Sequence, residues 1–305
     1  MRCAVIDPRL EVRVVSRRPL VYAAGANPDD DVPGHVRAAS GIVVHGDRLL
    51  VVQDDTAVIA SIAELEVTAI PLPRGAGGRR RFEVALGNKL DKLDLEAALV
   101  VDDELWAFGS GSLPIRDRIV RVRGGVIEIV DATALYARVR EAAGGCLNIE
   151  GVARTGESLW LFHRGNTGPE DRGPAVVKLD FAAARAWLDG GTAPDVSGVD
   201  RYDLGGIDGV RFGFTDAIAR GDRVFYVAAA EASEDAIADG AVLGSQLGVI
   251  DGDAIRCAPL CDHDGTPLKV EGLALIDDHH GWITIDPDDV DVPAPLYGIE
   301  LHGPW

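Results

Sequence analysis

Short runs of apolar residues, separated by turns rich in glycine and aspartate, recur along the whole chain. The clearest group starts with the runs 41–45 and 48–53, and two further apolar runs, near 57–62 and 66–72, complete it. Runs of about six residues with turn residues between them are typical of β-strands. The pattern therefore predicts groups of four short strands.

The start of each group is also repeated. A polar residue followed by small and apolar residues opens every copy, and these residues are Ser40, Glu96, Glu150, Asp216 and Glu271. The intervals between them are 56, 54, 66 and 55 residues. A fixed period of about fifty residues is typical of a radial repeat, in which each repeat forms one blade.

We therefore predict an all-β protein, a single β-propeller domain over residues 1–305 with five four-stranded blades. The last group is one strand short, whereas residues 10–16 form a surplus strand near the N-terminus. We expect this strand to complete the last blade, since closure removes exposed sheet edges. The predicted blades are about 40–74, 94–131, 148–205, 214–259, and 269–301 together with 10–16.

Two stretches between the strand groups have helical periodicity. Apolar residues at a spacing of three and four predict short helical inserts over 132–142 and 181–188. Residues 180–212 could instead contain further strands, and the propeller would then have six blades.

The first strand of each blade lines the channel of a propeller, so the repeated acids should meet at one mouth. Ionised carboxylates side by side raise one another's pKa, and a bound cation would relieve this. A ring of oxygen ligands favours Ca²⁺ before Mg²⁺. The predicted metal ligands are Ser40, Glu96, Glu150, Asp216 and Glu271. Alternatively, these carboxylates accept backbone N–H groups at the strand entry, as turn residues do.

Polar loops leave the second strand of each blade at the same mouth, where function usually lies on a rigid scaffold. The positive charges there would suit a small anionic molecule, although each cation could also pair with a neighbouring carboxylate. The predicted substrate-binding residues are Asp55, Lys89, Lys92, Ser110, Ser112, Arg164, Asn166, Glu231 and Asp286. The predicted catalytic residues are Glu150, His35, His163 and Arg164, with the histidines as candidate general bases.

Composition excludes several classes of partner. The formal net charge of −19 makes nucleic acid and anionic membranes unsuitable, since both attract basic surfaces. No N-terminal signal sequence and no apolar run of roughly 18 residues is evident. Four cysteines without zinc-ligand spacing indicate reduced thiols. We therefore expect a cytoplasmic protein.

Several motifs resemble a known group of propellers. The segments Asp94-Leu-Glu-Ala, Asn148-Ile-Glu-Gly and Val270-Glu-Gly-Leu-Ala are similar to the signature of esterase-like and phytase-like propellers and of SdiA-regulated domains. Together with Phe108-Gly-Ser-Gly-Ser and Phe212-Gly-Phe-Thr-Asp, they look like an uncharacterised bacterial propeller family that spans the whole chain. The resemblance implies a propeller with Ca²⁺ in its channel and implies no established reaction.

From the predicted mouth we expect a metal-dependent hydrolase of a small phosphoester, ester or lactone, in which the ion polarises a substrate oxygen and acidifies water. Two alternatives stay open. The protein could be a non-catalytic ligand-binding or scaffold propeller with a structural Ca²⁺, or an isomerase, lyase or cyclase that uses the same pocket.

Overall fold

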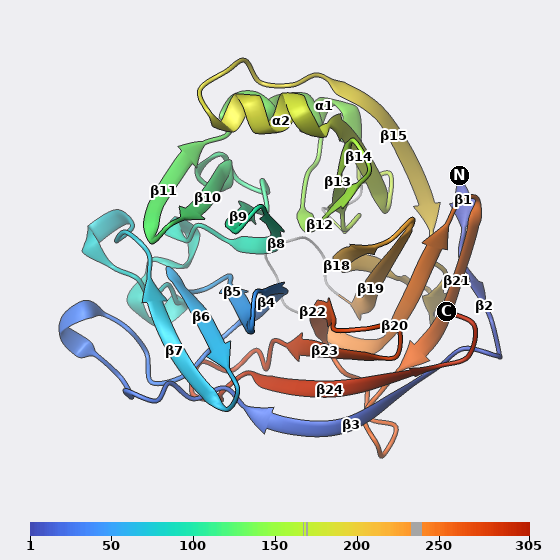
Figure 1. The fold of residues 1–305 in the computed structure, drawn as a ribbon, viewed down its shortest axis with the longest axis horizontal. Coiled ribbons are helices and arrows are strands. Elements are labelled where there is room, and N and C mark those ends of the chain that lie inside the picture. Colours follow the sequence, from blue (N-terminus) through green and yellow to red (C-terminus); the bar gives the residue numbers. More distant parts are fainter. Residues whose placement is uncertain (167, 169, 233–239) are drawn as a thin grey trace.

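Five small β-sheets surround a common axis in the computed structural model, which describes residues 1–305 apart from 167, 169 and 233–239. The fold is a five-bladed β-propeller (Figure 1), as the strand pattern predicts. Among the described residues, no helix has the length and apolar character needed to cross a membrane.

Each blade is a meander of neighbouring antiparallel strands. Blade 1 contains β4 (Ala39–His45), β5 (Arg48–Gln53), β6 (Val58–Ala63) and β7 (Glu66–Pro71). Blade 2 contains β8 (Leu95–Val101), β9 (Glu104–Gly109), β10 (Arg118–Arg123) and β11 (Val126–Asp131). Blade 3 contains β12 (Ile149–Thr155), β13 (Ser158–His163), β14 (Ala175–Asp180) and β15 (Val196–Asp203).

Blade 4 contains β18 (Gly213–Arg220), β19 (Arg223–Ala232), β20 (Ala241–Asp251) and β21 (Ala254–Leu260). Blade 5 contains β22 (Val270–Leu275), β23 (His280–Ile285), β24 (Pro295–His302) and the N-terminal β3 (Glu11–Pro19). The β3 strand pairs antiparallel with β24, from Glu11 opposite His302 to Pro19 opposite Pro295. The predicted closure of the ring is therefore confirmed, and the closing strand is longer than 10–16.

The first residues of the chain add two strands that the sequence pattern missed. Strand β1 (Arg2–Cys3) pairs in parallel with β15, and β2 (Val5–Ile6) pairs in parallel with β21. Blades 3 and 4 therefore have five strands each. Two-residue strands contain no full alternation of apolar and polar positions, so periodicity could not reveal them.

The six-blade alternative is wrong. Residues 180–212 contain α2 (Phe181–Leu188), the outer strand β15, and a small hairpin of β16 (Gly206–Ile207) and β17 (Val210–Arg211). The two predicted helical inserts are confirmed as α1 (Thr133–Ala143) and α2. Both helices lie on the outside of the ring (Figure 1).

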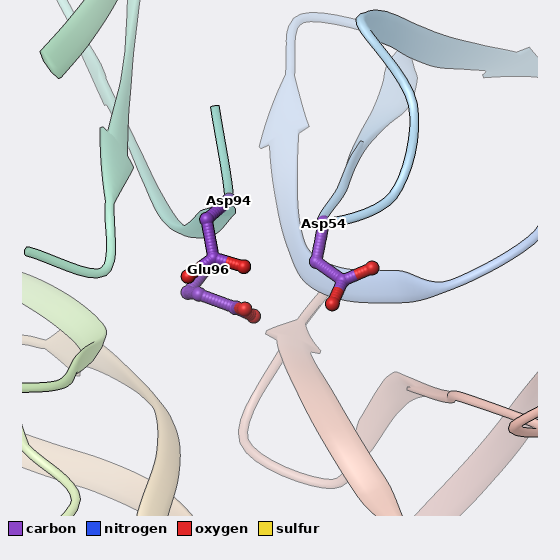
Figure 2. Close-up of side chains that lie close together, drawn as sticks. All are labelled: Asp54, Asp94 and Glu96. Carbon is purple, nitrogen blue, oxygen red and sulfur yellow. The ribbon is translucent and has the colours of Figure 1, made fainter. Parts of the chain in front are cut away.

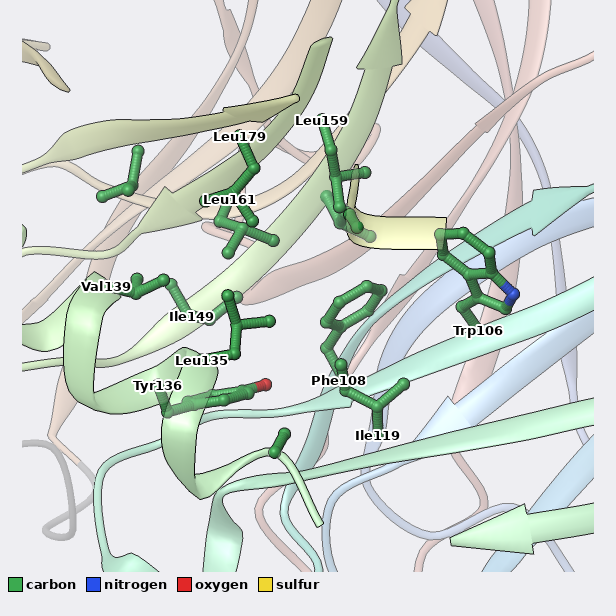
Figure 3. Close-up of a cluster of buried hydrophobic side chains, with 14 of the residues drawn as sticks. Trp106, Phe108, Ile119, Leu135, Tyr136, Val139, Ile149, Leu159, Leu161 and Leu179 are labelled. Carbon is green, nitrogen blue, oxygen red and sulfur yellow. The ribbon is translucent and has the colours of Figure 1, made fainter. Parts of the chain in front are cut away.

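The helices help to fill the space between blades 2 and 3. Figure 3 shows Leu135 and Tyr136 of α1 packed with Phe108 of β9 and Leu161 of β13. Trp106 is 1% exposed and stacks on Phe181 at the start of α2, with ring centroids 5.9 Å apart. Burial of these large side chains stabilises the contact between blades 2 and 3 by roughly 25 cal/mol per Å² of apolar area.

Candidate functional site

A β-bulge interrupts the first strand of every blade near its start. The pairing with the second strand skips one residue at the same place each time, and the skipped residues are Ser40, Glu96, Glu150, Thr215 and Glu271. Bulges redirect a side chain and often lie beside functional sites. The repeat seen in the sequence is thus a repeated bulge, and in blade 4 its member is Thr215 rather than Asp216.

Two of the five bulge residues, Ser40 and Thr215, have hydroxyl groups that connect neighbouring blades. Ser40 Oγ donates a hydrogen bond to the carbonyl of Leu95, and Thr215 Oγ1 donates to the carbonyl of Val270 at 2.6 Å. Each carbonyl directly precedes the bulge glutamate of the next blade. Both hydroxyl residues are buried, so these bonds fix the height at which the glutamates enter the channel.

Replacing Thr215 with valine should lower the free energy of unfolding by about 1–3 kcal/mol, because the buried carbonyl of Val270 would lose its donor at unchanged volume. Urea denaturation of the variant and the parent protein measures this difference. Thr68→Val is the matched control, since its hydroxyl lies on the partly buried strand β7. Equal losses in both variants would contradict the role of the Thr215 hydroxyl.

Asp216 lies one residue beyond the bulge and has a different environment. Its Oδ1 accepts the N–H of Ala217 at 2.7 Å, and its Oδ2 accepts the N–H of Leu273 in blade 5 at 2.8 Å. The side chain is buried, and burial raises its pKa well above the ordinary value. Both oxygens of Asp216 are therefore engaged by the backbone, which is the alternative that the sequence left open for the repeated acids.

A buried arginine supplies positive charge at the centre of the mouth. Arg164, which follows β13, lies 3.2 Å from Glu150, 3.9 Å from Glu271 and within hydrogen-bond distance of Glu231. Burial alone would lower the pKa of Arg164, but Glu150, Glu271 and Glu231 raise it. Burial raises the pKa values of Glu150 and Glu271 despite the opposing effect of Arg164. Three of the repeated or predicted acids thus share a protein cation.

A second cation lies beside Glu271. The ammonium of Lys269 is 2.6 Å from Asp288, 3.8 Å from Asp286 and 4.0 Å from Glu271. Glu271 is 5% exposed, and its Oε2 is buried without a hydrogen-bond partner. Lys269 stands two residues before the bulge, as Asp94 and Asn148 do in their blades. Side chains two apart on a strand share a face, and this spacing could have placed Lys269 in the site.

The third cation, Lys92, joins blades 1 and 2. Its Nζ is 2.5 Å from Asp54 Oδ2 and 2.7 Å from Asp94 Oδ1. Arg116 contacts the other oxygen of Asp94 at 2.8 Å, and Ser110 donates a hydrogen bond to that oxygen. Although burial raises the pKa of Asp94, Lys92 and Arg116 outweigh it and keep the pKa below its usual value.

Asp54, Asp94 and Glu96 form a compact group of carboxylates at this edge of the mouth. One oxygen of each lies within 4.8 Å of the others (Figure 2), with Asp54 following β5 and the other two at the start of β8. Burial, Asp94 and Glu150 raise the pKa of Glu96 well above its usual value. The oxygen-only donor set suits a hard divalent cation. The sequence did not predict Asp54 as a ligand, although the loop Gln53-Asp-Asp55 was recognised as polar.

One oxygen of this group is buried and has no donor. It is Oδ1 of Asp54. Lys92 neutralises one oxygen of each aspartate. Because buried polar atoms are normally satisfied, the unpartnered Oδ1 of Asp54 is the observation that favours an added cation here.

The remaining predicted site residues have partners within the protein. His163 is buried, accepts the N–H of Asn148 at Nδ1 and faces Asp171 at 3.2 Å through Nε2. Asn148 also donates to Asn166 at 3.3 Å. Ser112 accepts a hydrogen bond from Arg116 at 2.6 Å. Both ring nitrogens of His163 are thus engaged, which leaves it poorly placed to act as a general base.

His35 lies at the rim, where its Nε2 is 3.2 Å from the carbonyl of Val290. Next to it, a cavity of about 330 Å³ extends from the mouth, between the segment 82–92 and the loop 286–290, and Lys89 is part of its wall. Asp55 and Asp286 also line the cavity. Burial and the nearby Asp54 raise the pKa of Asp55 to about 7, and burial with Asp54 and Asp288 raises that of Asp286 to about 8 against the pull of Lys269.

The raised pKa of Asp286 predicts a pH dependence of stability. An aspartate titrates near 3.9 in the unfolded chain and near 8 here, so the folded state binds the extra proton between these values. Stability should therefore fall as the pH rises from about 4 to 8, and Asp286→Asn should flatten this slope. Melting temperatures from pH 4.5 to 8.5 measure it, with the exposed Asp195→Asn as control. Identical slopes in all three proteins would contradict the assignment.

A family model described as a family of unknown function (DUF6929) matches residues 35–301. A search of curated proteins found no match. Among solved structures, an unknown-function protein from Dyadobacter fermentans is 10% identical with a TM-score of 0.45, over 98% of this chain and 100% of that one. The PQQ-bound aldose sugar dehydrogenase of Streptomyces coelicolor is 13% identical with a TM-score of 0.43, over 98% and 100%.

A native arabinanase of Bacillus subtilis is also similar, with 10% identity and a TM-score of 0.42 over 87% of this chain and 94% of that one. At this distance the likenesses say nothing about function, because one fold supports many activities. The relation to esterase-like and phytase-like propellers stays a prediction.

Proposed function

This chain belongs to DUF6929, a family of unknown function, and we propose an activity for it from the site alone: metal-dependent hydrolysis of a small ester, lactone or phosphoester at the channel mouth. The supporting observation is the group Asp54, Asp94 and Glu96, in which one oxygen of each lies within 4.8 Å of the others and Asp54 Oδ1 is buried without a hydrogen-bond donor. Such a group is suited to Ca²⁺, and to Mg²⁺ as the alternative.

Glu96 and Asp54 would hold the ion, and Asp94 would contribute the oxygen that Lys92 also binds. A bound divalent ion polarises a substrate oxygen and lowers the pKa of bound water. Lys92 and Arg116 keep Asp94 ionised, as the lowered pKa of Asp94 indicates. These cations therefore maintain the negative charge that a metal requires, at the pH of ordinary buffers.

The neighbouring cavity supplies a group that can move a proton. Asp286 titrates near pH 8, so a large part of it is protonated at neutral pH, and its carboxyl group can donate to a leaving oxygen. General acids work best when their pKa lies near the operating pH. His163, expected from the sequence as a general base, has both ring nitrogens engaged, so we assign the proton-transfer role at this site to Asp286, as a general acid.

The alternative of a purely structural ion has one observation in its favour. Asp54 belongs to blade 1, and Asp94 and Glu96 belong to blade 2, so an ion there would connect two blades. The other acids of the mouth do not require an ion for this purpose, because Arg164 and Lys269 already lie between them.

A substrate screen with and without chelator tests the proposal. The full chain, stripped of metal and reloaded with Ca²⁺, should hydrolyse at least one member of a panel of nitrophenyl esters, nitrophenyl phosphates and lactones. EDTA should abolish turnover, and Ca²⁺ in excess should restore it. Full activity in EDTA would overturn the metal dependence. A rise in melting temperature with Ca²⁺ and no turnover on any substrate would support the structural ion instead.

A further inference from the structure

The cavity beside the channel mouth is lined by both apolar and acidic residues. Its volume of about 330 Å³ exceeds the space that a bare ion needs and lies in the range of small-molecule sites. Its apolar lining includes Phe82, Val84, Ala85 and Val290. The ring of Phe82 is 1% exposed, so it is fixed in place.

The lining is also rich in carboxylates. Six acidic residues line the cavity against three basic ones. Arg37 is 4% exposed and already pairs with Asp55 at 2.9 Å and Glu83 at 3.1 Å. Lys92 pairs with Asp54, which also lines the cavity, and with Asp94, which does not. The lining therefore has more negative than positive charge, and its buried cations are committed to protein carboxylates.

Two carboxylate oxygens of the lining residues accept no hydrogen bond. Asp54 Oδ1 and Asp55 Oδ1 are both buried and lack hydrogen-bond partners. A carboxylate accepts hydrogen bonds and donates none when ionised. An unsatisfied buried acceptor is unfavourable, so a ligand that brings donors to these two oxygens is stabilised by them.

We propose that this cavity binds a small primary ammonium ion with a short hydrocarbon body, its N–H groups directed at Asp54 and Asp55 and its carbon chain against Phe82 and Val290. Charge complementarity disfavours the anionic molecule expected from the sequence, because Lys92 and Arg37 have carboxylate partners. A primary ammonium ion offers three donors and positive charge.

If the protein is the proposed hydrolase, an amine site beside the carboxylate group defines its class of substrate: an ester, lactone or phosphoester that carries an amino group. Asp54 borders both sites, and its Oδ2 already pairs with Lys92. With the ion bound, Asp54 Oδ1 would serve the ion, and the ammonium group would pair with Asp55 Oδ1. The reacting group would then lie at the carboxylate group and the amine in the cavity.

Calorimetric titration with n-butylammonium tests the binding without any need for turnover. The full chain in EDTA should bind n-butylammonium at least about tenfold more tightly than the uncharged isostere 1-butanol, which corresponds to about 1.4 kcal/mol. Butyrate should not bind. Equal affinity for butylammonium and butanol, or tighter binding of butyrate, would overturn the proposal.

Two variants separate the cavity from general attraction to an acidic protein. Val290→Trp fills the rim at a position that is 42% exposed, so it should fold and lose butylammonium binding by at least about tenfold. Asp195→Asn removes an exposed charge on the loop between α2 and β15, where Asp195 pairs with Arg138 of α1. This variant should bind butylammonium as the parent does. Unchanged binding in Val290→Trp would overturn the site.

The outcome is independent of the hydrolase test. If butylammonium binds in the cavity but no substrate turns over, the proposed function fails and the ligand assignment stands. If the protein hydrolyses neutral esters in Ca²⁺ but shows no preference for butylammonium, the function stands and the amine assignment is overturned.

Discussion

Arg164→Met should destabilise the protein by about 3–5 kcal/mol, which is the usual cost of breaking a buried ion pair by removing one partner. Arg164 is 7% exposed and lies between Glu150, Glu231 and Glu271. Without the guanidinium, three buried carboxylates face one another. The deficit should be larger at pH 8 than at pH 5, since protonation of the glutamates relieves the repulsion as the pH falls.

Urea denaturation at both pH values measures the deficit. Arg138→Met is the matched control, because Arg138 pairs with Asp195 on the surface, where the side chains are 39% and 95% exposed. Exposed pairs contribute at most about 1 kcal/mol, so this control should unfold almost as the parent does. Equal effects of the two substitutions would contradict the central position of Arg164.

The second large effect concerns Glu96. Glu96→Gln should reduce Ca²⁺ affinity and turnover by at least about 100-fold, because even the groups that support a metal ligand typically contribute 10–100-fold. In EDTA the variant should melt at the same temperature as the parent or higher, since Asp94 and Glu150 disfavour the charge of Glu96. This combination separates a lost ligand from a damaged fold.

The exposed Glu66 on β7 provides the control, and Glu66→Gln should retain both Ca²⁺ binding and activity. Calorimetry and the hydrolase assay measure the two effects. A Glu96→Gln variant with parental Ca²⁺ affinity would show that the ion, if it binds, uses other residues.

Much of the fold was accessible from the sequence because blade strands have a strong signal. The apolar runs and their spacing predict the five blades, and the surplus strand over 10–16 predicts closure, which β3 confirms. Strands β1 and β2 escaped because two residues define no period. Their position is set by pairing with β15 and β21, about two hundred residues or more away along the chain.

The site was accessible only in part. The regular recurrence of a polar residue at the start of each strand group predicts that these residues lie at the same end of the channel. Glu96, Glu150 and Glu271 do occupy equivalent bulges in their blades. The offset in blade 4 was missed because Thr215 and Asp216 are both polar, and only strand pairing shows which one is skipped.

The counter-charges were harder to predict. Lys92 and Arg164 were recognised as basic residues near the mouth, but their partners are set by distance in space, as between Lys92 and Asp54 or Arg164 and Glu231. Arg37 and Lys269 do not belong to a set of basic residues that recurs at equivalent positions of the blades, so the repeat did not indicate them. From the acids the sequence predicts a bound cation, and this stays a prediction. The alternative, that basic side chains pair with the carboxylates, is what the structure shows for Lys92 and Arg164.

Calorimetric titration of the metal-stripped full chain with Ca²⁺ is the most direct test of the carboxylate group at Asp54, Asp94 and Glu96. We expect one ion per chain, with binding lost in Glu96→Gln and kept in Glu66→Gln. No binding of Ca²⁺ or Mg²⁺ at millimolar concentration, or binding that Glu96→Gln leaves unchanged, would contradict the account.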